Sequence, residues 1–256
     1  MKKFLSIIIM VAMILTLVSC GSAKEEQNNV SQSASNETTQ TKTAENTKDA
    51  NASTTENKGN TQETTANKSN SKTLIVYFSR VGATNFSDKV DVVASASLNS
   101  GKNGLVGNAE IIANIIKEET NGDVFQIKTV DSYSETYGDT VDQAAKEKKD
   151  NARPKLSSHV DNMDNYDIIF LVYPNWWGTI PMPVYTFLEE YNFSGKTIMP
   201  LCTHEGSAMG SSKGDIASLC PNAKLLDGLA IRGRDVNSSN TKESVNDWIK
   251  KSGIAN

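Results

Sequence analysis

Three short segments of this chain combine the residue types that hold a flat ring and an anion. Two tryptophans stand side by side in Tyr173–Pro181 (YPNWWGTIP). Small and polar residues fill Ser79–Thr84 (SRVGAT) and Thr203–Gly210 (THEGSAMG). A hydroxyl-bearing turn that leads into a helix suits a phosphate, because free backbone N–H groups and the helix dipole favour an anion. An aromatic loop beside a Gly/Ser loop suits a conjugated ring, so we expect the paired indoles to cover a ring that is not protein.

Each of these segments follows a predicted strand. Apolar runs at 73–78 (TLIVYF), 167–173 (DIIFLVY) and 196–202 (KTIMPLC) have the continuous hydrophobicity of strands buried on both faces of a parallel sheet. In such sheets ligands bind beyond the carboxyl ends of the strands, which is where the three segments lie. The sequence therefore predicts one site built from three strand ends.

The other predicted elements alternate between strand and helix. They are weaker strands at 124–129 and 225–231, and helices at 107–120, 140–150, 183–191, 212–219 and 240–251. The helix at 140–150 is polar and is expected to be exposed. The last helix is expected to begin with a capping box formed by Asn240 and Glu243. This alternation predicts an α/β fold with a doubly wound sheet and right-handed crossovers.

The strand that ends at Ser79, the run YPNWWGTIPMPVYTFLE and the run CTHEGSAMG together resemble the flavodoxin-like family, in particular its bacterial subgroup with a Trp-Trp-Gly loop. The resemblance spans nearly all of residues 72–256. It implies a flavodoxin-like doubly wound five-stranded parallel sheet in the order 2-1-3-4-5, with one flavin mononucleotide (FMN) held without a covalent bond. In the family the first loop grips the phosphate, and the second and third loops flank the isoalloxazine ring.

The chain departs from the family pattern between the first strand and the first helix. Family members run from the strand through Ser-x-x-Gly-Asn-Thr directly into the helix, whereas residues 85–105 intervene here. Either Gly82–Thr84 or Gly107–Ala109 can therefore be the phosphate turn.

We favour a composite turn, because a helix start presents unpaired N–H groups. Its members are Ser79, Arg80, Gly107, Asn108 and Ala109. Ala109 stands where the family usually has a hydroxyl, so one phosphate hydrogen bond is expected to be missing. Thr84 replaces that bond if the insertion folds back.

The second and third loops supply the remaining candidate cofactor contacts. At least one of Trp176 and Trp177 is expected to contact the ring, with the protein core or a partner-binding patch as the alternatives, and Gly178 is expected to permit close approach. Residues that shape these loops or offer backbone groups to the ring are Pro174, Asn175, Thr179, Thr203, His204, Glu205, Gly206 and Ser207. His204 is expected to be a surface turn histidine and not a general base. No side chain is assigned a catalytic role, and no hydrolase or metal-binding motif is found.

The N-terminal residues predict export and a lipid anchor. Residues 1–19 combine Lys2 and Lys3 with an apolar core too short to span a membrane. The core ends in Leu17-Val-Ser-Cys20, which resembles the lipobox of bacterial lipoproteins and implies lipidation of Cys20; an ordinary signal peptide or an uncleaved anchor is the alternative. The expected location is the extracytoplasmic face of the bacterial cell membrane.

Residues 20–71 are predicted to form a disordered tether between this anchor and one domain at 72–256. Of the residues from 21 to 71, 30 are Ser, Thr, Asn or Gln and none is aromatic, so the segment cannot bury a core. Removal of Lys2 and Lys3 takes the net charge from −4 to −6. This acidic balance argues against a nucleic-acid partner. Whether Cys202 and Cys220 pair is left open.

Two functions follow from these patterns. The first is a membrane-tethered FMN protein that transfers electrons to a redox partner protein or reduces a small acceptor such as a quinone, with NAD(P)H as a possible direct donor. The second is a non-enzymatic binding lipoprotein that has kept the fold without the flavin. The insertion and Ala109 motivate the second reading.

Overall fold

The computed structural model describes residues 71–87, 90–91, 93, 96–101 and 104–254. These residues all belong to the second of the two units into which the chain divides. The predicted signal peptide (1–19), the predicted lipidation site Cys20 and all but the last residue of the predicted tether lie outside the described residues. No helix within the described ranges is long and apolar enough to cross a membrane.

A parallel sheet forms the centre of this unit. Its strands, in chain order, are β1 (Thr73–Phe78), β4 (Asp123–Ile127), β5 (Ile168–Pro174), β6 (Thr197–His204), β7 (Lys224–Leu225) and β8 (Leu229–Arg232). Their spatial order is β4-β1-β5-β6-β7, with β8 also paired to β6, and every pairing is parallel. The predicted order 2-1-3-4-5 is confirmed, except that two short strands, β7 and β8, share the fifth position.

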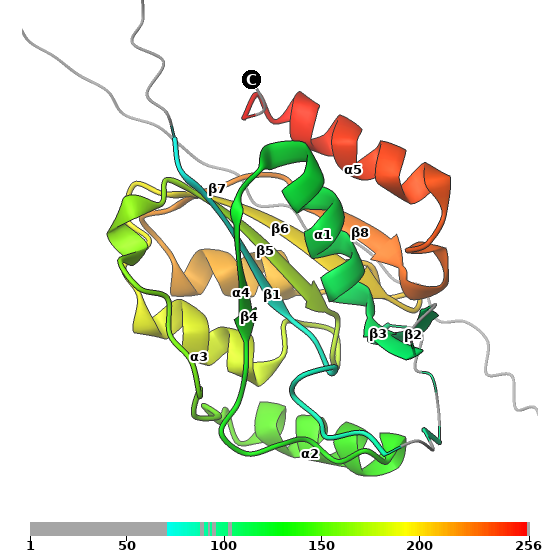
Figure 1. Cartoon of the computed structure of the whole chain (residues 1–256). Coiled ribbons are helices and arrows are strands. Elements are labelled where there is room, and N and C mark those ends of the chain that lie inside the picture. The colour runs from blue at the N-terminus through cyan, green and yellow to red at the C-terminus, as the bar shows by residue number, and fades with distance from the viewer. Residues whose placement is uncertain (1–70, 88–89, 92, 94–95, 102–103, 255–256) are drawn as a thin grey trace, which may run out of the picture. The chain divides into compact units, whose positions relative to one another are not determined.

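Helices connect the strands and cover both faces of the sheet. They are α1 (Asn108–Thr120), α2 (Tyr137–Lys149), α3 (Met182–Glu190), α4 (Ser212–Leu219) and α5 (Ser239–Lys251), with short 3-10 turns η1 (Met163–Asn165) and η2 (Gly233–Asp235). Figure 1 shows α1 and α5 on one side of the sheet and α3 and α4 on the other, with α2 below the ends of the strands at the bottom of the view. The predicted doubly wound arrangement is confirmed.

Each face of the sheet buries its own hydrophobic core, because successive residues of a strand point to opposite faces. Leu74, Val76 and Phe78 of β1 pack in the core beneath α3 and α4. Ile75 and Tyr77 pack in the core beneath α1 and α5. The continuous apolar run of β1 is thus explained by burial on both sides.

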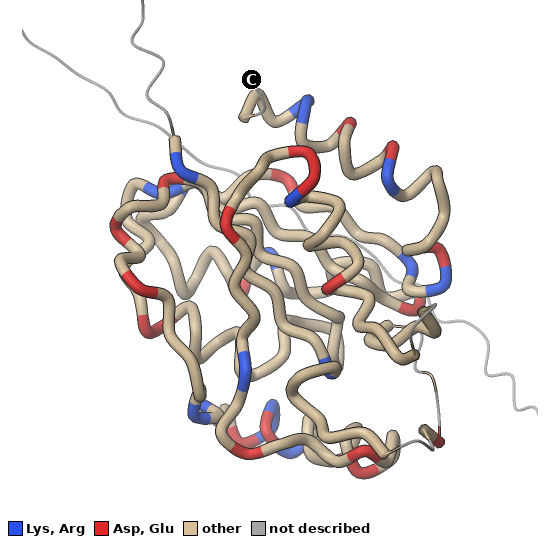
Figure 2. The backbone as a smooth tube through the Cα atoms, in the orientation of Figure 1, with Lys and Arg blue, Asp and Glu red and all other residues tan. Residues whose placement is uncertain are grey.

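Charged residues lie outside the central strands. β5 and β6 contain no Lys, Arg, Asp or Glu. Figure 2 shows the charged positions along the helices and connecting loops that surround them. The loops at the ends of the strands therefore hold the polar groups that a ligand can meet.

The insertion before α1 forms an antiparallel strand pair that the sequence did not predict. β2 (Leu98–Gly101) pairs with β3 (Gly104–Gly107), with Leu98 opposite Gly107. Leu98 is buried, which anchors the pair to the domain. Because β3 ends where α1 begins, the pair brings the insertion to the N-terminus of α1.

The start of α5 differs from the prediction. Ser238 is the N-cap, and its Oγ accepts a hydrogen bond from the backbone N–H of Thr241 at 3.1 Å. The predicted capping box of Asn240 and Glu243 is wrong, because Ser238 has the extended backbone of a capping residue and both predicted residues lie inside the helix.

Cys202 and Cys220 are both buried, free thiols. Burial raises the pKa of Cys202 to about 12 and that of Cys220 to about 11, because a thiolate is poorly solvated in an apolar core. Both thiols therefore stay protonated at neutral pH and serve as core residues.

Candidate functional site

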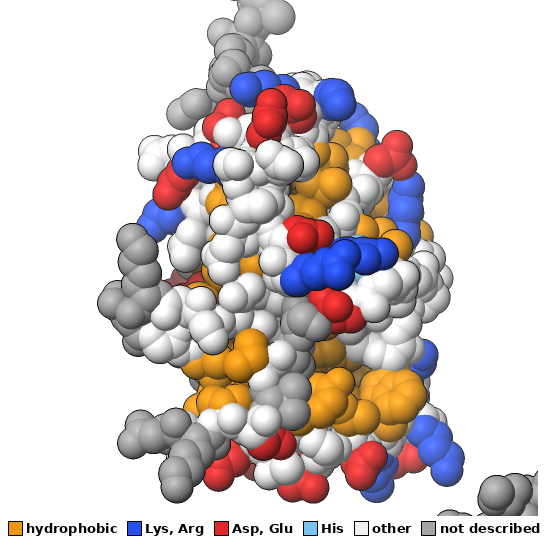
Figure 3. Space-filling model, turned by 90° about the vertical axis from the view of Figure 1, so that its right-hand side faces the viewer, with side chains coloured by type: hydrophobic (Ala, Val, Ile, Leu, Met, Phe, Trp, Pro, Cys, Tyr) orange, Lys and Arg blue, Asp and Glu red, His pale blue; other side chains and the backbone are white. Residues whose placement is uncertain are grey.

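A cavity of about 540 Å³ lies where the loops after β1, β5 and β6 meet. Its lining residues are Arg80, Val93, Ala96, Ser97, Tyr137, Thr140, Val141, Ala144, Asn175, Trp176, Trp177, Gly178, Glu205 and Ser207. Two of its aromatic side chains are open to solvent: Tyr137 is 40% exposed and Trp177 is 53% exposed. Figure 3 shows hydrophobic side chains gathered on this side of the molecule at the height of α2.

All three predicted loops contribute to the cavity. The predicted site residues that line it are Arg80, Asn175, Trp176, Trp177, Gly178, Glu205 and Ser207. The predicted site residues that do not line it are Ser79, Thr84, Gly107, Asn108, Ala109, Pro174, Thr179, Thr203, His204 and Gly206. All of the second group except Gly206 are buried.

One wall of the cavity contains, apart from Tyr137, no residue that the sequence had suggested for the site. The inner face of α2 supplies Tyr137, Thr140, Val141 and Ala144. This helix was predicted as exposed because its sequence is mostly polar. The spacing of Thr140, Val141 and Ala144 was the available signal, since residues three and four apart share one face of a helix.

The aromatic loop is a tight turn at Trp177 and Gly178. Trp176 and Thr179 exchange both backbone hydrogen bonds, at 3.0 and 3.2 Å. The two central residues have φ angles of +54° and +83°, as in a type I′ turn. A left-handed conformation costs a residue with a side chain about 1–2 kcal/mol, so Trp177 must be held by its surroundings.

α2 provides the groups that hold Trp177. The indole Nε1 donates to the backbone oxygen of Val141 at 3.0 Å, and the Lys148 ammonium donates to the backbone oxygen of Trp177. The indole therefore lies against α2 with half of its surface open to solvent.

Trp176 differs from its neighbour because it packs on other protein rings. It makes edge-to-face contacts with Phe78 and Tyr133, with ring centroids 5.3 and 5.2 Å apart. Its Nε1 donates to the Ser97 hydroxyl at 2.9 Å. The expectation that both indoles cover a non-protein ring is thus modified: Trp176 covers protein on one side while lining the cavity on another.

Asn175 joins the second loop to the third. Its backbone N–H donates to the Thr203 oxygen at 2.7 Å, and its Nδ2 donates to the Ala208 oxygen at 2.9 Å. Its Oδ1 accepts from the Gly178 N–H at 2.9 Å. Asn175 is 8% exposed, so these bonds lie inside the site and fix the two loops relative to each other.

His204 is a buried residue, and its prediction as a surface histidine is wrong. It is 7% exposed because the side chain turns back under its own loop, where Nδ1 accepts from the Gly206 N–H at 2.8 Å. Desolvation and the nearby Arg232 cation lower the pKa of His204. The ring is therefore held neutral, with its proton on Nε2.

The first loop brings Ser79 against the start of α1, and the composite phosphate turn stays a prediction. A Cβ added at Gly107 would lie 1.8 Å from the Ser79 Oγ, so a side chain at that position would displace the Ser79 hydroxyl. Ser79 Oγ also accepts from the Val81 N–H at 3.1 Å. By contrast, the Gly82 turn packs against Gln126 of β4, and Thr84 forms a backbone bridge with Tyr133.

Arg80 is the one cation that lines the cavity within the described ranges. Its side chain is 1% exposed, and Nη2 donates to the backbone oxygens of Ser134 and Glu135. Among the described residues Nε and Nη1 have no hydrogen-bond partner, and no carboxylate forms an ion pair with the guanidinium. Desolvation lowers the pKa of Arg80, with Asp91 opposing that shift. The guanidinium carbon also lies 5.0 Å from the centroid of the Phe86 ring, a cation–π contact. A buried cation without a carboxylate partner favours an anion.

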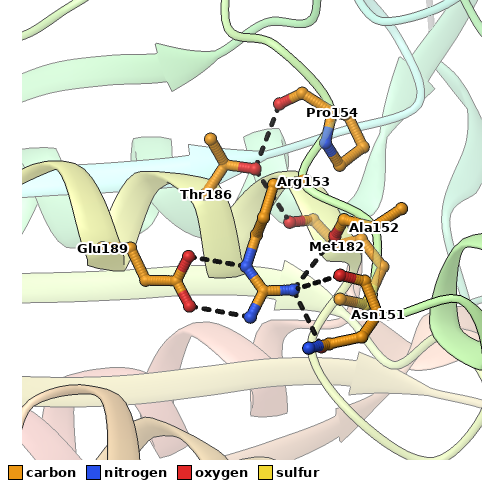
Figure 4. Close-up of polar contacts among 7 residues, drawn as sticks. All are labelled: Asn151, Ala152, Arg153, Pro154, Met182, Thr186 and Glu189. Carbon is orange, nitrogen blue, oxygen red and sulfur yellow. Dashed lines mark hydrogen bonds and ion pairs between the residues drawn. The ribbon is translucent and has the colours of Figure 1, made fainter.

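The α2 wall is fastened at its C-terminal end by Arg153. The guanidinium donates to both carboxylate oxygens of Glu189 on α3, at 2.6 and 2.7 Å, and Nη1 donates to the carbonyl oxygens of Asn151 and Ala152 (Figure 4). These bonds raise the pKa of Arg153 and lower that of Glu189. Nearer the cavity, the Tyr133 hydroxyl donates to Glu147 of α2 at 2.7 Å. The cavity thus has a fixed wall on this side.

Comparison with solved structures agrees with this fold. A protein described as a flavoprotein from Bacteroides eggerthii is 22% identical, with a TM-score of 0.55, over 72% of this chain and 99% of that one. Another from Bacteroides uniformis is 24% identical, with a TM-score of 0.53, over 70% and 98% of the two chains. A flavoprotein in complex with FMN from Lactobacillus acidophilus is 18% identical, with a TM-score of 0.48, over 66% of this chain and 99% of that one.

A search of curated proteins found no match. The flavodoxin family model matches residues 102–252, which is more than half of the chain. The parallel sheet and its strand order agree with that match. This chain belongs to the flavodoxin family.

Proposed function

We propose that this protein binds FMN in the cavity at the strand ends and transfers electrons to a redox partner protein or to a small acceptor such as a quinone. The observation that carries the proposal is Arg80, a buried guanidinium that has no carboxylate partner among the described residues and lies in the wall of an otherwise largely apolar cavity. Family membership adds independent support.

The residues present fit this cofactor. A cavity of about 540 Å³ is within the usual range for a small-molecule site, about 300–1,000 Å³. Arg80 suits the phosphate, and the glycine at 107 leaves room for Ser79 at the helix start. Trp177 and Tyr137 offer aromatic surface to a flat ring at the open side. Glu205 and Ser207 are exposed polar residues on the opposite loop and suit the polar edge of the ring.

The protein's task in this function is to bind, orient and limit access. Bound FMN supplies the electron-transfer chemistry. Asn175 keeps the two flanking loops at a constant separation, and the α2 wall covers one side of the ring. His204 is neutral and committed to the Gly206 N–H through Nδ1, so it needs no role in proton transfer.

We place this function at the outer face of the bacterial cell membrane. Cys20 carries the lipid anchor, and the polar tether of residues 21–71 has an average reach of roughly 40 Å as a flexible coil. That reach suits an acceptor dissolved in the membrane, such as a quinone. Loss of membrane association in the Cys20→Ser variant is the expected result in fractionated cells, and retention would contradict the anchor.

The visible spectrum of the purified full-length chain tests the proposal. We expect a yellow protein, or an apoprotein that takes up FMN with a dissociation constant of about 1 μM or lower, as suits a standard cofactor site. A colourless chain that binds no FMN at that concentration favours the alternative, a binding lipoprotein that has the fold without the flavin.

A further inference from the structure

We infer that Ser97, which the insertion carries to the start of α1, donates a hydrogen bond from its hydroxyl to the phosphate of the bound flavin. This inference rests on the proposed function. It assigns to the insertion the hydroxyl that Ala109 lacks.

Ser97 lies where the three cofactor loops meet. Its Oγ accepts from the Trp176 Nε1 at 2.9 Å, and its backbone oxygen accepts from the Asn108 N–H at 3.0 Å. The preceding carbonyl, that of Ala96, accepts from the Thr203 hydroxyl at 2.6 Å. One dipeptide thus contacts the aromatic loop, the first helix and the strand end of β6.

The Ser97 hydroxyl still has a proton to donate. The bond from Trp176 uses an acceptor site of Oγ, and no acceptor for its proton is found among the described residues. Ser97 is 5% exposed and lines the same cavity as Arg80. A hydroxyl donor and a cation in one cavity wall are the groups that bind a phosphate monoester, which at neutral pH accepts hydrogen bonds through its anionic oxygens.

The start of α1 offers no side-chain hydroxyl of its own to the phosphate. The helix has no side-chain cap, and Ala109, which offers no hydroxyl, is buried. Ser97 reaches the same helix end from outside, because its carbonyl oxygen binds the first N–H of the helix. A hydroxyl lost from the helix is therefore supplied by the insertion.

The position of Ser97 is fixed by its neighbours. Leu98 is buried and paired with Gly107, and the Asn99 side chain donates to the Gly233 oxygen at 3.4 Å. Ala96 before it is bonded to Thr203, so Ser97 is held on both sides and loses little freedom when it binds a ligand, which favours a fixed hydrogen-bond donor over a moving lid.

Titration of the full-length apoprotein with FMN and with riboflavin, which has no phosphate, tests the inference. For Ser97→Ala we expect the FMN dissociation constant to rise by about tenfold or more, as for a lost hydrogen bond to a charged group. Riboflavin affinity should change by less than about threefold, since the ring contacts remain. Ser97→Thr keeps the hydroxyl and should restore FMN binding.

Two control variants separate this role from its alternatives. Trp176→Phe removes the donor to Ser97 but keeps an aromatic ring, so it should lower FMN and riboflavin affinity together. Ser100→Ala changes an exposed hydroxyl of β2, the strand that follows Ser97, and should alter neither affinity.

Three results would overturn the inference. Ser97→Ala could leave FMN affinity unchanged, or it could lower the affinities for FMN and riboflavin equally. The third is that Trp176→Phe lowers FMN affinity alone, and by as much as Ser97→Ala does. If the wild-type chain binds neither flavin, the proposed function itself fails, which is a different outcome.

Discussion

Replacing Gly210 with alanine is expected to lower the free energy of unfolding by about 2–5 kcal/mol, from a steric clash with backbone and from a left-handed conformation. For a domain of this size that loss corresponds to a fall in melting temperature of about 5–15 °C. FMN affinity should fall by about tenfold or more, because the loops beside the ring lose their spacing.

The reason lies in a contact between two backbones. A Cβ at Gly210 would stand 2.1 Å from the Gly178 oxygen and 2.8 Å from its carbonyl carbon. The neighbouring Ser211 N–H donates to the same oxygen at 2.8 Å. Neither backbone can turn aside as a flexible side chain would, so the aromatic loop and the third loop must separate.

Gly206→Ala is the matched control for Gly210→Ala. Gly206 is in the same loop and has a φ of +116°, but a Cβ there meets no atom within 4 Å. It therefore suffers conformational strain without the clash. Thermal unfolding of both variants followed by circular dichroism makes the comparison. If Gly210→Ala is no less stable than Gly206→Ala, the close approach of the two loops is not a feature of the protein in solution.

The sheet and the three loops that contribute to the cavity could be predicted because their signals lie in short, continuous stretches of the sequence. β1, β5 and β6 are continuous apolar runs, and a loop at the carboxyl end of a parallel strand has only one edge of the sheet to occupy. Asn175 and Trp177 could be assigned to the site on that basis. Their placement required no knowledge of contacts distant in the sequence.

The wall formed by α2 and the insertion could not be predicted in the same way. Thr140 and Ala144 look like surface residues until Trp177 lies across the helix, which is a contact between distant segments. Ser97 has no hydrophobic pattern around it, and its position depends on pairing of β2 with β3. His204 is buried because its own loop folds over it, which its neighbours in the sequence do not indicate.

Replacing Arg80 with methionine is expected to raise the FMN dissociation constant by about 100-fold, with riboflavin affinity nearly unchanged. Loss of one partner of a buried charge pair costs about 2–5 kcal/mol, and each 1.4 kcal/mol is tenfold in affinity. Methionine is unbranched and apolar, so it fills most of the volume of the arginine stem without its charge.

The stability of the apoprotein should respond differently from its affinity. The variant leaves the backbone oxygens of Ser134 and Glu135 without their donor, which destabilises the folded protein. It also removes a buried charge, whose desolvation is unfavourable and lowers the pKa of Arg80, and this removal stabilises the folded protein. Because these effects oppose each other, we expect the free energy of unfolding to change by less than about 2 kcal/mol. FMN should then raise the melting temperature of the wild-type protein far more than that of the variant, since ligand stabilisation follows the ratio of concentration to dissociation constant.

Arg232→Met is the control for the loss of one positive charge. Arg232 is exposed, belongs to β8 and does not line the cavity. Its removal should leave FMN affinity within about threefold of wild type, as for a surface charge screened by salt. Flavin fluorescence titrations of both variants, with FMN and with riboflavin, make the comparison. If Arg80→Met lowers the affinity for both flavins equally, the guanidinium supports the ring and not the phosphate. If the FMN affinity of this variant is unchanged, Arg80 does not belong to the cofactor site, and the main support for FMN in this cavity is lost.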